Sequence, residues 1–172
     1  MARALIVGCG CRGRELGGRL VAAGWAVRGT SRRERELAAI EAAGIEPALA
    51  DPDRPGTVLE LVGDVAVLVF ALGSATGPAE AAAAIHGPRL ERVLERLVET
   101  PVRGVVYEGA GSVDAAVLRG GVEAVRAAGE RWRIPVEVVD EHFPSHEGWA
   151  ERMETAVAAV LGGREKERAK LR

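Results

Sequence analysis

The chain has few of the residues that stabilise small folds by means other than a hydrophobic core. Only two of its 172 residues are cysteines, Cys9 and Cys11, which lie too close in sequence to staple a fold. No further cysteine completes a zinc set, so we expect no metal site and interpret the pair as small residues of a tight turn, with a redox or metal role as the alternative. A chain of this length buries about 70% of the surface that its unfolded form exposes, so it needs no such support.

Aromatic residues, long apolar runs and an excess of positive charge are also scarce. Aromatics make up 3% of the chain against 48% hydrophobic residues, so Ala, Val, Leu and Ile must build the core, which is typical of a parallel sheet covered by helices. No apolar run approaches a membrane span, and the N-terminus does not have the pattern of a signal peptide. A formal net charge of -2 argues against nucleic acid or an anionic membrane as the main partner. We therefore expect a cytoplasmic protein.

Strand-like runs alternate with helical stretches along the chain. Strands are expected over residues 3–7, 25–29, 45–50, 65–70, 102–107 and 136–139. Helices are expected from the end of the first strand to Gly24, over 33–43, 57–62, 79–85, 88–99 and 113–132, and around Trp149–Leu161. This alternation predicts right-handed crossovers and a doubly wound parallel sheet in the order 3-2-1-4-5-6, with helices on both faces. We expect one domain over residues 1–162 and a charged, frayed tail over 163–172.

The central motif is Gly8-Cys9-Gly10-Cys11-Arg12-Gly13, which has the form G-x-G-x-x-G and stands between the first strand and the first helix. The first glycine permits a sharp turn, the second lets a diphosphate approach the backbone, and the third allows close packing of helix and sheet. Unpaired N–H groups and the positive end of the helix dipole then favour phosphate. The motif predicts a dinucleotide-binding (Rossmann) domain. The alternative is a glycine turn that only packs.

The end of the second strand, Gly29-Thr30-Ser31-Arg32-Arg33, indicates which dinucleotide is bound. An acidic residue there would hold the ribose 2′-hydroxyl of NAD, but the segment offers hydroxyls and two guanidiniums instead. Because the guanidinium fork matches a phosphate, NADP(H) is predicted over NAD(H), with a solvated basic helix start as the alternative. After the third strand, Asp51 either accepts a hydrogen bond from the adenine amino group or caps the following helix.

These segments together resemble the start of extended or atypical short-chain dehydrogenases/reductases, a group that includes NAD-dependent epimerase-like proteins. The resemblance is strongest over residues 4–13 and 23–32, continues through Asp51 and residues 65–73, and is weaker over 106–112 and 136–144. It implies that Thr30, Ser31 and Arg32 meet the adenosine ribose or its 2′-phosphate, and that Asp51 lies near adenine. It also implies that Ala71-Leu72-Gly73 passes beneath a ribose of the cofactor.

The second half of the chain departs from this family at the proton relay. Catalytic members carry a Tyr and a Lys one helical turn apart on the helix after the fifth strand, whereas residues 113–132 contain neither. Catalytic members also add a longer C-terminal substrate region, so by this comparison the chain is expected to be a truncated member. The remaining catalytic candidates are Tyr107 and Glu108 at the end of the fifth strand and His142 after the sixth. Alternatively, Glu108 pairs with an arginine and His142 is solvated.

Two functions follow from this pattern. The first is an NADP(H)-binding module that senses redox state or regulates a partner without standard catalysis. The second is a small NADP(H)-dependent oxidoreductase or epimerase-like enzyme with a non-standard acid/base. Helices 88–99 and 113–132 are expected side by side on one face of the sheet, and because such helices pair in relatives of the family, we predict a homodimer.

Overall fold

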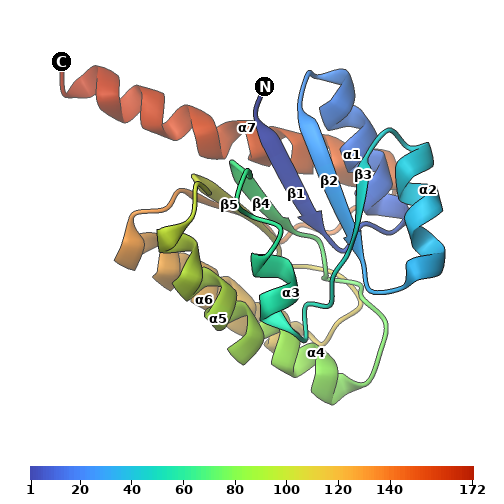
Figure 1. Cartoon of the computed structure of the whole chain (residues 1–172). Helices are drawn as coiled ribbons and strands as arrows, with labels where there is room; N and C mark the ends of the chain where they lie inside the picture. Colours follow the sequence, from blue (N-terminus) through green and yellow to red (C-terminus); the bar gives the residue numbers. More distant parts are fainter.

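The computed structural model contains a six-stranded parallel sheet in the order β3-β2-β1-β4-β5-β6, which confirms the predicted topology (Figure 1). The structure describes residues 1–162 and 169–172, so most of the expected tail lies outside the described residues. The strands are β1 (Arg3–Val7), β2 (Ala26–Ser31), β3 (Glu46–Leu49), β4 (Val67–Phe70), β5 (Gly104–Glu108) and β6 (Val136–Val139). The α-helices are α1 (Cys11–Ala22), α2 (Leu37–Ala42), α3 (Pro55–Leu59), α4 (Ala79–His86), α5 (Pro88–Arg96), α6 (Ala115–Trp132) and α7 (His146–Lys170).

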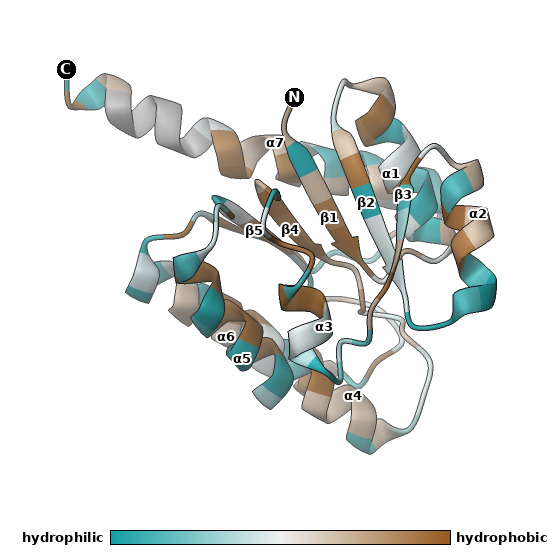
Figure 2. Ribbon diagram, in the orientation of Figure 1, coloured by the Kyte–Doolittle hydropathy of each residue, from teal (hydrophilic) through white to brown (hydrophobic). Residues whose placement is uncertain are grey.

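The core forms two layers because alternate residues of each strand point to opposite faces of the sheet. Leu5 and Leu68 belong to the layer under α3, α4, α5 and α6, whereas Ile6 and Val69 belong to the layer under α1, α2 and α7. The central strands β1 and β4 are therefore buried on both sides, and Figure 2 shows them as largely hydrophobic along their length. This arrangement explains why their sequences read as continuous apolar runs instead of alternating ones.

Two apolar residues that fall within the expected helices are exposed. Val21 follows Leu20 directly in α1, and a step of one residue turns it about 100° away from the buried side formed by Leu16 and Leu20. Val98 lies in a 3-10 turn, η2 (Leu97–Glu99), where the tighter winding breaks the α-helical spacing that begins at Leu90. The expectation that helices 88–99 and 113–132 lie side by side on one face of the sheet is confirmed, since α5 packs against α6.

The segment after β2 also differs from the expectation. The predicted helix over residues 33–43 begins as a 3-10 turn, η1 (Glu34–Glu36), and becomes α-helical only from Leu37. The strand runs on to Ser31, whose hydroxyl donates to the Glu36 carboxylate over 3.1 Å. This bond between the strand end and η1 brings an acidic side chain back to the edge of the sheet.

The carboxyl ends of all strands lie at one edge of the sheet, and the connections that leave adjacent strands there run to opposite faces. After β1 the chain passes to α1 on one face, and after β4 it passes to α4 on the opposite face (Figure 1). Such a change of direction between adjacent strands opens a crevice at the edge of a doubly wound sheet. Among the residues that the structure describes, no helix combines the length and apolarity needed to cross a membrane.

Candidate functional site

A cavity of about 400 Å³ occupies the crevice between β1 and β4. Its walls come mainly from the β1–α1 loop, the end of β2, the loop between β4 and α4, α4 itself and the first turn of α7. The predicted cofactor residues in its wall are Gly8, Cys9, Gly10, Cys11, Arg12, Gly13, Thr30, Ser31, Arg32, Ala71 and Leu72. The structure therefore brings most of the predicted set to one place.

The three glycines of the motif have different surroundings. Gly8 has φ +93°, and a Cβ on it would lie 2.6 Å from the Ala71 carbonyl oxygen. A Cβ on Gly13 would lie 2.8 Å from the Gly8 carbonyl oxygen, whereas a Cβ on Gly10 would meet nothing within 4 Å. Gly8 and Gly13 are thus required by contacts within the protein. Gly10 is exposed at the start of α1 and leaves its space open to the cavity.

The two cysteines of the motif also differ in their surroundings, since one is buried and the other is exposed. Cys9 is buried and its Sγ fills the space above Gly29, where a Cβ would lie 2.5 Å from it. Burial raises the pKa of the Cys9 thiol to about 12, so it stays protonated and inert. Cys11 is exposed, and its Sγ accepts a hydrogen bond from Arg14 over 3.3 Å. The described residues contain no cluster of three or more His, Cys, Asp or Glu with a metal-binding arrangement.

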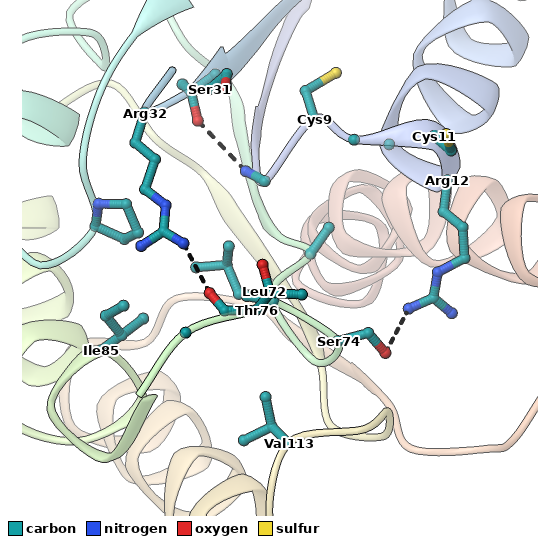
Figure 3. Close-up of a pocket in the computed structure, with 18 of the residues that line it drawn as sticks. Cys9, Cys11, Arg12, Ser31, Arg32, Leu72, Ser74, Thr76, Ile85 and Val113 are labelled. Atoms are coloured by element: carbon teal, nitrogen blue, oxygen red, sulfur yellow. Dashed lines mark hydrogen bonds between the residues drawn. The ribbon is translucent and has the colours of Figure 1, made fainter. Parts of the chain in front are cut away.

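At the outer end of the cavity, Arg32 reaches across to the β4–α4 loop. Its Nη2 donates to the Thr76 carbonyl oxygen over 2.7 Å (Figure 3). Glu36 also lines this end, with its carboxylate 3.1 Å from the Ser31 hydroxyl and 3.4 Å from Arg33 Nη1. Sequence reasoning missed Glu36 because it lies beyond the strand end, and only the η1 turn returns it to the site. The available signal was its spacing of three residues from Arg33, which suits an ion pair on one helical turn.

At the inner end, Arg12 is held by contacts from three elements. Its Nη2 lies 3.2 Å from Ser74 Oγ in the β4–α4 loop (Figure 3) and 3.0 Å from Glu108 Oε2 on β5. Its guanidinium lies 4.8 Å from the centroid of the Trp149 ring on α7, a cation–π distance. The interpretation of Glu108 as the partner of an arginine is therefore the one that the geometry favours.

Behind the cavity wall, two buried side chains link the core to the β4–α4 loop. Tyr107 is fully buried, and its hydroxyl donates to His86 Nδ1 over 2.6 Å. His86 Nε2 donates to the Leu72 carbonyl oxygen over 3.1 Å, because a carbonyl only accepts, which fixes the neutral tautomer of the ring. Burial lowers the pKa of His86 and raises that of Tyr107, so both stay neutral near physiological pH.

The other predicted residues lie outside the cavity wall. Asp51 Oδ1 accepts from the Asp53 backbone N–H over 2.9 Å in the turn before α3, and only its neighbours Ala50 and Pro52 line the cavity. The capping interpretation is wrong, because the N-cap of α3 is Arg54 and the helix has no side-chain cap bond. Gly73 is buried and donates to Glu108 Oε1 over 2.6 Å. His142 is exposed in the β6–α7 loop. None of the three predicted catalytic candidates, Tyr107, Glu108 and His142, therefore lines the cavity. Two other histidines, His86 and His146, do.

No protein-family model matches the sequence, and no curated protein matches it either. Solved structures do match the fold. The UDP-glucuronic acid 4-epimerase from Bacillus cereus in complex with NAD has a TM-score of 0.64 at 11% identity, over 80% of this chain and 55% of that one. The triphenylmethane reductase of Citrobacter sp. complexed with NADP(H) gives 0.61 at 15%, over 81% and 49%. The short-chain dehydrogenase from Rhodopseudomonas palustris gives 0.69 at 15%, over 88% and 89%.

At these identities the likeness shows the fold, which is the Rossmann fold of short-chain dehydrogenases/reductases and epimerases. The expected resemblance is confirmed at that level. The chain spans about half the length of the epimerase and the reductase.

Proposed function

We propose that the cavity binds a nicotinamide dinucleotide, with its diphosphate on the Gly8–Gly13 loop and NADP(H) preferred over NAD(H). The observation that carries the proposal is Gly10. Its missing side chain serves no contact inside the protein, yet it stands at the start of α1 and borders the cavity. A diphosphate that approaches the backbone at this point requires the space that a Cβ would fill.

The start of α1 suits an anion. Gly10 is the N-cap and provides no side-chain acceptor, and the first turn carries no acidic residue, so the first backbone N–H groups are free to donate to a ligand. The positive end of the helix dipole adds to their attraction for phosphate. Arg12 and Arg14 contribute positive charge in the same turn.

The preference for NADP(H) rests on the two arginines at the end of β2. Arg32 and Arg33 are both exposed, and Arg32 lies across the cavity mouth, where a 2′-phosphate offers a stronger acceptor than the Thr76 carbonyl. Glu36 opposes this preference, because its carboxylate repels a phosphate and accepts a ribose hydroxyl instead. Its contact with Arg33 over 3.4 Å partly neutralises it. Among similar folds, the epimerase structure contains NAD and the reductase structure contains NADP(H).

The same proposal assigns the chain a binding or redox-sensing role without the standard chemistry of short-chain dehydrogenases. Helix α6 contains neither Tyr nor Lys, so the proton relay of that family has no counterpart on it. Tyr107 and Glu108, which stand at the end of the preceding strand, are buried behind the cavity wall and do not line the cavity. The enzymatic alternative would need His86 or His146, the two titratable rings in the wall, as acid or base.

The decisive experiment compares Gly10→Ala with Gly18→Ala, since a Cβ at either position meets nothing within 4 Å. Both variants should therefore fold. Gly18→Ala, in the helix interior, should have an unchanged or slightly higher melting temperature, and Gly10→Ala, at the N-cap, a slightly lower one. Gly10→Ala should weaken NADPH binding at least about tenfold, measured by nicotinamide fluorescence, whereas Gly18→Ala should bind as wild type. Wild-type protein that binds neither NADPH nor NADH, or a Gly10→Ala variant of undiminished affinity, would refute the diphosphate site.

The choice between cofactors is tested separately. Arg32→Ala should reduce the preference for NADPH over NADH by about tenfold, as expected for loss of a charge-assisted hydrogen bond. Glu36→Gln should shift the preference the other way, toward NADPH. Equal affinities of the wild type for both cofactors would reject the 2′-phosphate assignment and leave the dinucleotide site itself intact.

The homodimer and the cytoplasmic location stay predictions. The α5–α6 pair is the expected contact surface between two copies. A monomeric mass in solution scattering would contradict the dimer.

A further inference from the structure

Glu108 is the most deeply buried acidic side chain beside the cavity, with 2% of it exposed. One carboxylate oxygen, Oε1, accepts a hydrogen bond from the Gly73 backbone N–H over 2.6 Å. The other, Oε2, accepts no hydrogen bond from any residue that the structure describes, and its only close charge is Arg12 Nη2 at 3.0 Å. An ionised carboxylate in such a place depends on that single countercharge.

The countercharge comes from the loop that we propose holds the diphosphate. Arg12 is the second residue of α1, and its guanidinium lies in the cavity wall with about a quarter of the side chain exposed. A bound diphosphate carries two negative charges within reach of the same α1 turn. It therefore competes with Glu108 for the guanidinium, and the diphosphate offers the stronger acceptors.

We propose that this exchange couples dinucleotide binding to a proton: the diphosphate takes Arg12 from Glu108, and the Glu108 carboxylate then takes up one proton from solvent. The inference rests on the proposed function, since it needs the diphosphate on the Gly8–Gly13 loop. Without Arg12, a buried carboxylate is more stable as the neutral acid. The protonated Oε2 keeps the Gly73 contact at Oε1, so the loop that carries Gly73 need not move.

Among the groups that surround Glu108 in the described part of the chain, Arg12 is the charge that determines whether the carboxyl is ionised. Trp149 approaches from α7, Gly73 from the β4–α4 loop, and Tyr107 precedes it on β5. Neither Trp149 nor Tyr107 is charged, and His86 lies beyond Tyr107 as a neutral ring. Burial raises the pKa of Glu108. Arg12 opposes that rise most strongly, and the Gly73 N–H and the Trp149 indole N–H oppose it less, so removal of Arg12 raises the pKa further. His146, which lines the same cavity from the first turn of α7, is the titratable group to be distinguished in the test.

The number of protons taken up is measured by isothermal titration calorimetry with NADP⁺ in two buffers of different ionisation enthalpy. The 2′-phosphate of NADP⁺ also titrates near neutral pH, so the quantity of interest is the difference between wild type and Glu108→Gln. We expect wild type to take up close to one proton more than Glu108→Gln. Equal proton counts in wild type and Glu108→Gln would overturn the proposal. Proton uptake that is unchanged in Glu108→Gln but lost in His146→Gln would assign the proton to His146 and overturn it as well.

Affinity as a function of pH provides a second readout. Between the pKa values of the free and bound states, the Kd of wild type should rise by about tenfold per pH unit relative to Glu108→Gln. The two proteins should bind equally at the acidic end, where Glu108 is protonated in both states of the wild type, and Glu108→Gln should bind more tightly at the alkaline end. A role of Glu108 in folding alone predicts weaker binding by the variant at every pH.

A variant of the other partner covers the case in which Glu108→Gln does not fold. In Arg12→Ala the carboxylate has lost its countercharge before the ligand arrives, so binding should be weaker and the excess proton uptake should vanish. If Arg12→Ala takes up the proton as wild type does, the exchange is wrong. Failure of the proposed function is distinguishable from all these results, because wild type would then give no binding heat at any pH.

Discussion

The adjacent glycines of α6, Gly120 and Gly121, allow a sharp test of how the core supports the cavity. The perturbation is Gly121→Ala. A Cβ at Gly121 would lie 1.9 Å from Tyr107 Oη and 2.6 Å from Tyr107 Cζ, so the ring has to move. The same hydroxyl donates to His86 over 2.6 Å, and His86 holds the Leu72 carbonyl in the cavity wall. The methyl group should thus break a buried hydrogen bond as well as crowd the core.

The magnitude follows from three contributions. Overpacking of a buried site costs about 1–3 kcal/mol. A buried hydrogen bond whose partner is left unsatisfied costs about 1–3 kcal/mol more. Replacing a helical glycine by alanine returns about 1 kcal/mol of helix propensity. The free energy of unfolding should therefore fall by about 1–5 kcal/mol.

The assay is urea unfolding followed by circular dichroism, with Gly120→Ala as the matched control. Gly120 is exposed in the same helix and a Cβ there meets nothing within 4 Å, so Gly120→Ala should raise the free energy of unfolding by up to about 1 kcal/mol. The two variants should therefore shift stability in opposite directions. If Gly121→Ala unfolds at the same urea concentration as Gly120→Ala, the contact between α6 and Tyr107 is wrong.

Two further predictions concern charge. Because the pKa of His86 is lower in the folded protein than in the unfolded chain, the unfolded chain binds the proton first, and stability should fall as pH drops through about 6.5. His86→Leu should remove that part of the slope in urea unfolding measured across this range, and an unchanged slope would contradict the assignment. Arg28 donates to the Leu61 carbonyl and to Asp64, each over 2.8 Å, so Arg28→Met should lower the free energy of unfolding by about 1–2 kcal/mol. Arg92→Met, which removes only an exposed 3.6 Å pair, should stay within about 0.5 kcal/mol of wild type, and equal losses in the two variants would rule out a special role for the Arg28 cluster.

The sequence predicts the strand order well because each signal it uses is local. The apolar runs of β1 and β4 report burial on both faces, and the glycine motif between β1 and α1 reports the first crossover. Helix faces are predicted less well at their ends. Val98 fits the α-helical spacing, but the chain tightens into η2 before reaching it, and nothing in the local pattern announces that change.

The sequence predicts the part of the candidate site that is formed by the glycine loop and by the residues at the ends of the strands. Contacts between residues far apart in sequence decide the rest. Glu108 and Arg12 are separated by more than half the length of the chain, yet they form the ion pair at the inner end of the cavity. Tyr107 ends its strand at the expected edge, but Gly121 on the following helix leaves room for its ring inside the core. Such pairings depend on tertiary packing, which periodicity does not encode.

Of the three glycines in the motif, Gly10 is therefore the one that indicates a function. Gly8 and Gly13 are fixed by the Ala71 and Gly8 carbonyl oxygens, and those contacts would demand glycine in a protein that bound nothing. Gly10 has no such contact, and as the N-cap of α1 it also lacks the side-chain oxygen with which Ser, Asp or Asn would bond the first N–H groups of the helix. A residue that relieves no internal contact and leaves the capping position without a side-chain acceptor needs a reason outside the protein. A ligand that approaches the backbone at the start of α1 supplies that reason.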